Sequence, residues 1–113
     1  SVSRMIKLAE TSKTYPKLHW SNRIHIDDLA AFLAHLLHVE QAEKSYICSN
    51  SQPLPLHEVI QWFQQQLELP ALVLESDAPS GKKIYASNMQ QMGFELQHPN
   101  CFDDYLALLG EFR

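Results

Sequence analysis

The stretch of residues 20–37 changes its hydrophobic period partway along, and this change constrains the fold more than any other feature of the sequence. At its start, Ile24 and Ile26 alternate with polar residues, which is typical of a strand. From residue 27 onward the apolar residues recur at the spacing of a helix instead. The stretch therefore predicts a strand that leads directly into a helix.

The predicted helix has an acidic start and one apolar face. Asp27 and Asp28 are each suited to the N-cap position, because a carboxylate accepts first-turn N–H groups and is favoured by the positive end of the helix dipole. The apolar face of the helix consists of Leu29, Ala30, Phe32, Leu33, Leu36 and Leu37.

The junction between the predicted strand and helix collects polar side chains. Asn22, Arg23 and His25 precede the helix, and the two aspartates begin it. A strand that runs straight into a helix brings these residues near one point. If the chain binds a ligand, this junction is the best candidate for the site.

Apolar spacing and turn residues predict further short elements along the chain. Helices are expected over residues 2–10, from Pro55 to Leu69, over residues 87–90 with Gly93 as the terminating residue, and from residue 100 on, and short strands over residues 45–49 and 71–75. The pattern predicts an α+β fold, a small helix-rich domain with a short mixed sheet of about three strands and four to five helices. We expect residues 1–113 to form a single domain.

Composition and charge exclude several functional classes. The 45% of hydrophobic residues can form a core, and no apolar run is long enough to span a membrane. The net charge of −4 leaves no clustered basic face for nucleic acid. Cys48 and Cys101 are too sparse for a zinc motif or a disulfide framework, so we expect a reducing, cytoplasmic location.

The common catalytic motifs are absent. Gly81, Gly93 and Gly110 lie too far apart for a phosphate-binding loop, which needs closely spaced glycines. No tyrosine is followed four positions later by a lysine, and no Gly-x-Ser-x-Gly sequence occurs. We therefore expect no catalytic and no cofactor-binding residue in this chain.

Several short segments nevertheless form a recognisable series. They are Asn22 to Ala30, Tyr46 to Pro53, Pro55 to Leu69, Gly81 to Ile84, Met89 to Phe94 and His98-Pro99. In order and spacing they resemble the C-terminal lobe of extended and atypical short-chain dehydrogenase/reductases. These form the NAD(P)-dependent nucleoside-diphosphate-sugar epimerase/dehydratase superfamily, and the resemblance covers most of the chain from about residue 20 onward.

The resemblance implies that this chain is the substrate-binding lobe of a larger NAD(P)-dependent epimerase, dehydratase or reductase. The glycine-rich cofactor loop and the Tyr-x-x-x-Lys pair of that superfamily would then belong to an N-terminal Rossmann lobe, which is the partner expected for this chain. NAD(P) and a small-molecule substrate such as a nucleotide-sugar are implied for the parent protein. The opening Ser1-Val2 would fit either a processed protein or a segment of a longer protein, and we favour the segment. The uncovered lobe face is expected to favour self-association.

The expected substrate-binding residues of this lobe are Asn22, Arg23, His25 and Lys83. Arg23 can bind a phosphate or carboxylate through its planar fork, or form a salt bridge with a nearby aspartate. His25 can serve as a base or a ligand contact near neutral pH, or only hydrogen-bond an aspartate. Lys83 can meet an anionic ligand or only keep its loop soluble.

Two histidines of the predicted helix raise the question of a metal site. His35 and His38 are three positions apart, a spacing that can bring two imidazoles to one metal ion. No third ligand follows at a fixed spacing. A solvated helix face is the better interpretation, and we expect no metal site.

A second functional class remains open. The chain can also be read as a free-standing, non-enzymatic interaction module that uses its apolar faces to hold a partner. The length of the parent reading frame separates the two readings, because only the enzyme lobe requires a glycine-rich strand-loop-helix roughly 150 residues or more upstream.

The isolated chain should bind no dinucleotide, because it lacks the closely spaced glycines that let a backbone approach a pyrophosphate. Calorimetric titration with NAD(H) and NADP(H) at millimolar concentration should give no saturable heat. A micromolar dissociation constant would contradict the prediction.

Overall fold

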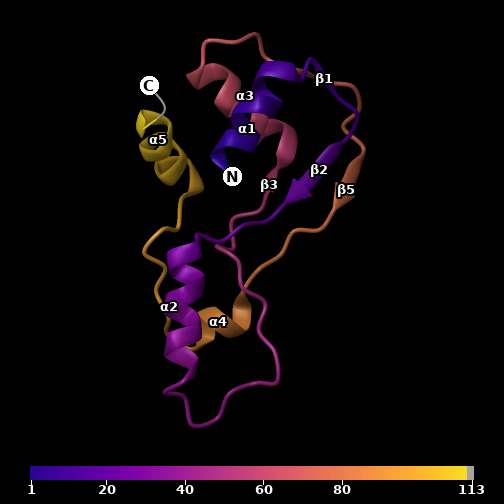
Figure 1. Cartoon of the computed structure of the whole chain (residues 1–113). Coiled ribbons are helices and arrows are strands. Elements are labelled where there is room, and N and C mark those ends of the chain that lie inside the picture. Colours follow the sequence, from indigo (N-terminus) through magenta and orange to yellow (C-terminus); the bar gives the residue numbers. More distant parts are fainter. Residues whose placement is uncertain (112–113) are drawn as a thin grey trace. The chain divides into compact units, whose positions relative to one another are not determined.

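The computed structural model describes residues 1–111, and its contacts divide the chain into two compact units, each of which is described by itself (Figure 1). Unit 1 comprises residues 1–21 and 54–83. Unit 2 comprises residues 22–53 and the chain from residue 84 onward.

Unit 1 contains two packed helices, α1 (Val2–Thr11) and α3 (Leu56–Gln66) (Figure 1). The Ser1 hydroxyl caps α1 by accepting the amide N–H of Arg4 at 3.4 Å. Pro55 occupies the N-cap position of α3, which suits a residue with no N–H to satisfy. Both helices were predicted from the sequence, and both predictions are confirmed within a few residues.

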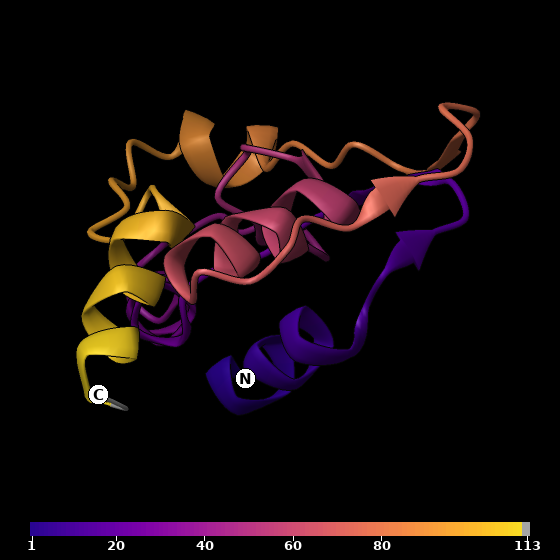
Figure 2. The same ribbon diagram turned by 90° about the horizontal axis from the view of Figure 1, so that it is seen from above.

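Unit 1 also contains two small sheets. After α1 the chain enters β1 (Thr14–Tyr15), which pairs in parallel with β4 (Val73–Leu74) (Figure 2). The second sheet has β2 (Leu18–Ser21) at its centre, antiparallel to β3 (Leu54–Pro55) and parallel to β5 (Pro79–Gly81). These short mixed sheets, together with the helices, confirm the predicted α+β class.

Gly81 ends β5 in a conformation that admits no side chain. Its φ is +74°, and an added Cβ would lie 2.7 Å from the carbonyl oxygen of Trp20. Since both backbone strain and a backbone clash oppose any larger residue, this glycine is required for the close approach of β5 to β2.

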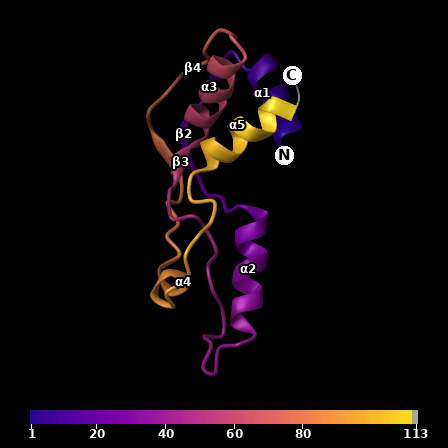
Figure 3. The ribbon, with the colours of Figure 1, turned by 90° about the vertical axis from the view of Figure 1, so that its left-hand side faces the viewer.

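Unit 2 contains α2 (Ile26–Leu36), α4 (Ser87–Gln91) and α5 (Cys101–Glu111). Phe32, Ala86 and Met89 are fully buried at its core. The centroid of the Phe32 ring lies 5.3 Å from that of Tyr46 and 5.2 Å from that of Phe94, and both ring pairs are edge-to-face. A long connection without helix or strand follows α2 (Figure 3). As predicted, Gly93 follows α4 with a positive φ of 75°.

Two predicted strands are wrong. The strand expected through Ile24 and Ile26 ends at Ser21, and residues 45–49 form no strand. Both segments run through unit 2, where isolated hydrogen bonds replace a ladder. The amide of Asn50 donates to the carbonyl of Arg23 at 2.8 Å, and the Ser49 hydroxyl donates to the carbonyl of Ile84 at 3.3 Å.

The apolar face of α2 is buried only in part. Phe32 is buried, but Leu33 and Leu37 are 54% and 84% exposed. The Asp28 side chain is 1% exposed, so a carboxylate is buried on this helix while these two leucines are exposed. The physical reason is that the helix is rotated to bury a carboxylate with its own hydrogen-bond partners. An apolar stripe therefore faces outward, consisting of Ile26, Ala30, Leu33 and Leu37.

None of the helices found in residues 1–111 has the length and apolarity needed to cross a membrane. Cys48 and Cys101 are both free thiols. Burial raises the pKa of the Cys48 thiol above its usual value.

Gln64 is a buried amide that ties several parts of unit 1 together. Its Nε2 donates to the carbonyls of Ala9 and Ser12 at 3.1 and 3.0 Å. Its Oε1 accepts the amide N–H of Leu72 at 2.7 Å. One side chain of α3 thereby satisfies backbone groups at the end of α1 and before β4.

Replacing Gln64 with Leu should lower the free energy of unfolding by about 2–4 kcal/mol, because backbone groups at Ala9 and Leu72 would stay buried without partners. Urea denaturation measures this change. Gln65→Leu is the matched control, since Gln65 is exposed, and it should change stability by less than about 0.5 kcal/mol. If the two substitutions change the free energy of unfolding equally, the hydrogen bonds of the Gln64 amide do not stabilise unit 1.

Candidate functional site

A cavity of about 230 Å³ lies within unit 2 and is the best candidate site. Its wall is formed by the segment before α2 and the first residue of that helix, one residue of the connection after α2, one residue of the loop before α5, and one side of α5. The lining residues are Arg23, Ile24, His25, Ile26, Asn50, His98, Cys101, Asp104, Tyr105 and Leu108. Apolar side chains and a few polar groups thus share one concave surface, as is usual for small-molecule sites.

The segment before α2 is fixed by its own polar groups. The Asn22 Oδ1 accepts the amide N–H of Ile84 at 2.8 Å, and the Arg23 carbonyl accepts that of Asn50. His25 is the N-cap of α2, with its Nδ1 accepting the amide N–H of Asp27 at 3.0 Å. The prediction that Asp27 or Asp28 caps this helix is therefore wrong, because an imidazole nitrogen already accepts the N–H group.

Asp28 has a different role from capping. Its two carboxylate oxygens accept the backbone N–H groups of Gln97 and His98 at 2.8 and 2.9 Å. Hydrogen bonds to a charged acceptor are stronger than neutral ones, and both oxygens are used. Asp28 therefore holds the loop before α5 against the start of α2.

His98 is brought to the cavity wall by that loop. Its ring stacks on His25 with centroids 3.8 Å apart and an interplanar angle of 10°. Its Nδ1 lies 2.7 Å from Oδ1 of Asp104. The hydrogen bond to this carboxylate raises the pKa of His98 above its usual value.

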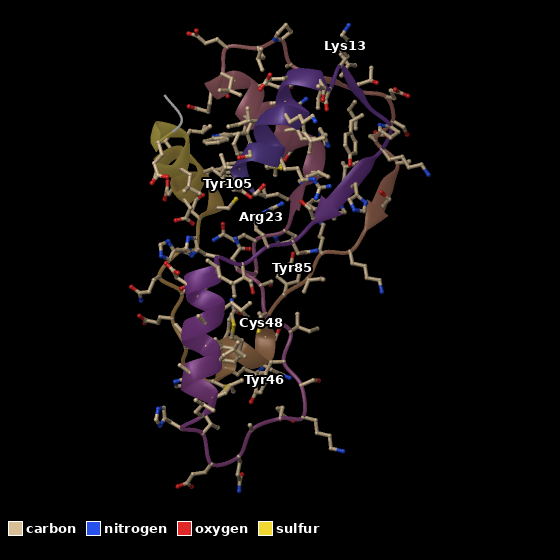
Figure 4. All side chains as sticks on the ribbon, viewed as in Figure 1. Lys13, Arg23, Tyr46, Cys48, Tyr85 and Tyr105 are labelled. Carbon is tan, nitrogen blue, oxygen red and sulfur yellow. The ribbon has the colours of Figure 1, made fainter. Side chains whose placement is uncertain are left out.

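Arg23 lies beside two protonatable groups of α5. Burial raises the pKa of the Cys101 thiol and of the Tyr105 hydroxyl above their usual values. The Arg23 guanidinium hydrogen-bonds both groups and offsets part of each rise in pKa. Figure 4 labels Arg23 and Tyr105 among the side chains of this region. The cavity therefore offers a fixed positive charge beside a neutral hydroxyl and a neutral thiol.

The residues proposed from the sequence do not all meet at this cavity. Arg23 and His25 line it. Asn22 is not among the lining residues, since its side-chain oxygen holds the Ile84 amide. Lys83 belongs to unit 1, where its Nζ lies 4.1 Å above the Trp20 ring.

Sequence reasoning missed most of the other lining residues, among them Asn50, His98, Asp104 and Tyr105. The available signal was the predicted start of the last helix, where the Asn100 Oδ1 accepts the Phe102 amide at 2.9 Å. A helix that begins there places Asp104 and Tyr105 in its first turns. Nothing local in the sequence showed that this helix start would meet Arg23.

Chemically, the cavity suits binding more than covalent catalysis. The Cys101 thiol is held neutral by burial, and a neutral thiol is a poor nucleophile. The guanidinium, hydroxyl and imidazole groups can instead donate hydrogen bonds to an anionic or hydroxyl-rich ligand.

One solved structure matches almost the whole chain. It comes from Methylobacillus flagellatus, is provisionally assigned as an NAD-dependent epimerase/dehydratase, and agrees with this chain at a TM-score of 0.73 and 31% sequence identity. The match covers 97% of this chain and 42% of that protein, so the chain spans less than half of its length. No family model and no curated protein matches the sequence.

Replacing Asp28 with Ala should lower the free energy of unfolding by about 3 kcal/mol or more, because two backbone N–H groups lose a charged acceptor. Thermal or urea denaturation measures the loss. Asp27→Ala is the matched control, since the Asp27 side chain is 74% exposed, and it should cost less than about 1 kcal/mol. If both variants lose the same small amount, the Asp28 carboxylate does not hold the loop.

Proposed function

We propose that the chain is part of an NAD-dependent epimerase/dehydratase and forms the substrate-binding lobe of its parent protein. The similarity extends over 97% of the chain, and the cavity of unit 2 gives that lobe a binding surface. The observation that carries the proposal is the position of Arg23, which lines the cavity and whose guanidinium hydrogen-bonds Cys101 and Tyr105.

The size of the cavity limits what it can hold. Sites for whole drug-sized ligands usually measure roughly 300–1,000 Å³, and this cavity measures about 230 Å³. It therefore suits one phosphate group or one sugar ring of a larger ligand such as a nucleotide-sugar. The remainder of the ligand would be bound by other parts of the parent protein.

Those other parts include the N-terminal Rossmann lobe that we propose as the partner of this chain. That lobe would bind NAD(P) and carry the catalytic residues of an isomerase or oxidoreductase. The outward apolar stripe of α2 supports this partner, because Leu33 and Leu37 are 54% and 84% exposed, and lobe interfaces cover such surfaces. The two free thiols support a cytoplasmic location.

The same stripe also favours the alternative function. In a free-standing interaction module, Ile26, Ala30, Leu33 and Leu37 would contact a separate protein or a second copy of the chain. That reading does not use the polar groups of the cavity. The substrate-binding lobe accounts for both features and is the function that we favour.

Replacing Arg23 with Ala in the parent protein should weaken binding of a nucleotide-sugar by at least tenfold. A charge-assisted hydrogen bond to a ligand anion contributes about 1.5–3 kcal/mol, and 1.4 kcal/mol is tenfold in affinity. Calorimetric titration with UDP-glucose is the measurement, and inorganic pyrophosphate tests the anionic part alone.

Arg4→Ala is the control, because Arg4 is an exposed arginine of α1 in unit 1. It should leave affinity and stability unchanged. Denaturation of Arg23→Ala must accompany the titration, since its guanidinium contacts Cys101 and Tyr105. A strong loss of stability with unchanged affinity for the folded fraction would make Arg23 a structural residue and reject its binding role.

A further inference from the structure

Three potential metal ligands converge on the rim of the cavity. His25, Asp27 and His98 each offer one ligand atom, and these atoms all lie within 4.8 Å of one another. The Asp27 Oδ2 is 3.9 Å from the Nε2 of His98 and 3.9 Å from the Nδ1 of His25. Sequence spacing did not indicate this group, because the loop that carries His98 is distant from α2 along the chain.

His98 is oriented as a metal ligand would be. Its Nδ1 is engaged by the Asp104 carboxylate at 2.7 Å, which leaves Nε2 directed to the side where Asp27 lies. A carboxylate on one imidazole nitrogen fixes the tautomer and raises the basicity of the other nitrogen. Asp104 is outside the group of three, so it is a separate observation in favour of coordination.

The spacing is close to what a metal ion requires. Tetrahedral zinc with bonds of about 2.0–2.1 Å holds its ligand atoms roughly 3.4 Å apart. Two of the three separations are 3.9 Å and all three are within 4.8 Å, so binding an ion requires the ligand atoms to close by about 0.5 to 1.4 Å. Asp27 can supply its part of this shift, because its side chain is 74% exposed, and the two imidazole rings, which stack 10° from parallel, would turn toward the ion. His25 would exchange its hydrogen bond with the Asp27 amide for the metal.

The surrounding charge also favours a cation. The Asp104 carboxylate lies 2.7 Å from the Nδ1 of His98, the Asp27 carboxylate lies 3.9 Å from its Nε2, and the Asp28 carboxylate accepts its backbone N–H at 2.9 Å. Arg23 is oriented toward Cys101 and Tyr105. A divalent ion at the histidine pair would meet three nearby carboxylates.

We propose that His25, Asp27 and His98 form a divalent-metal site that prefers Zn²⁺. Two imidazoles with one carboxylate favour zinc over magnesium or calcium, which prefer oxygen ligands. Three protein ligands leave a fourth position open to water or a ligand group, as in catalytic zinc sites. Since His25 and His98 also line the cavity, that open position is at its rim. The site does not depend on the substrate-binding proposal.

The experiment is a calorimetric titration of Zn²⁺ into the metal-free, full-length protein in a non-chelating buffer. One saturable equivalent is expected at this site, and His98→Gln should weaken it by at least tenfold. Asp104→Asn removes no ligand, yet it should weaken the same binding by roughly 10- to 100-fold, because the carboxylate that orients the His98 ring is lost.

Two further variants protect the test from misfolding and from non-specific binding. Asp27→Asn replaces an exposed ligand, so the protein should fold normally and lose zinc affinity. His38→Gln is the matched control, since His38 is an exposed histidine outside the group, and it should leave binding unchanged. Absence of saturable zinc binding, or binding that survives His98→Gln and Asp27→Asn, would overturn the proposal.

Discussion

The cavity of unit 2 depends above all on the buried carboxylate of Asp28. Both of its oxygens accept backbone amides, those of Gln97 and His98, and the side chain is 1% exposed. A buried charge persists only where hydrogen bonds replace its hydration. Satisfying Asp28 therefore fixes the loop before α5, and this loop carries His98 to the stacked position on His25.

Elsewhere in unit 2, individual side-chain hydrogen bonds likewise take the place of strand pairing. Asn22 and Ser51 accept the amides of Ile84 and Ala86 at 2.8 and 2.9 Å, and Asn50 donates through its side chain to the carbonyl of Pro99 at 3.3 Å. Each bond joins segments far apart in sequence. Because side chains of this kind specify single contacts, extended segments can meet without forming strands.

The cavity wall has two electrostatic sides. At one side, the Arg23 guanidinium offsets the burial of Cys101 and Tyr105 and is suited to an anion. At the other, His25 and His98 lie among carboxylates and are suited to a cation. An anionic ligand together with a metal ion would match both sides, because each is bound by complementary charge.

The sequence by itself determined the helices and the α+β class, and it predicted the resemblance to an epimerase/dehydratase that one solved structure supports. Apolar spacing and turn residues are local signals, so α1, α3, α4 and α5 were predictable. The tertiary structure alone decided that α2 buries Asp28 and exposes Leu33 and Leu37. It also decided that His98 and Asp104 join His25, while Lys83 stays in unit 1. The reason is physical: hydrophobic period reports which residues prefer burial, but a carboxylate is buried only where distant backbone amides receive it.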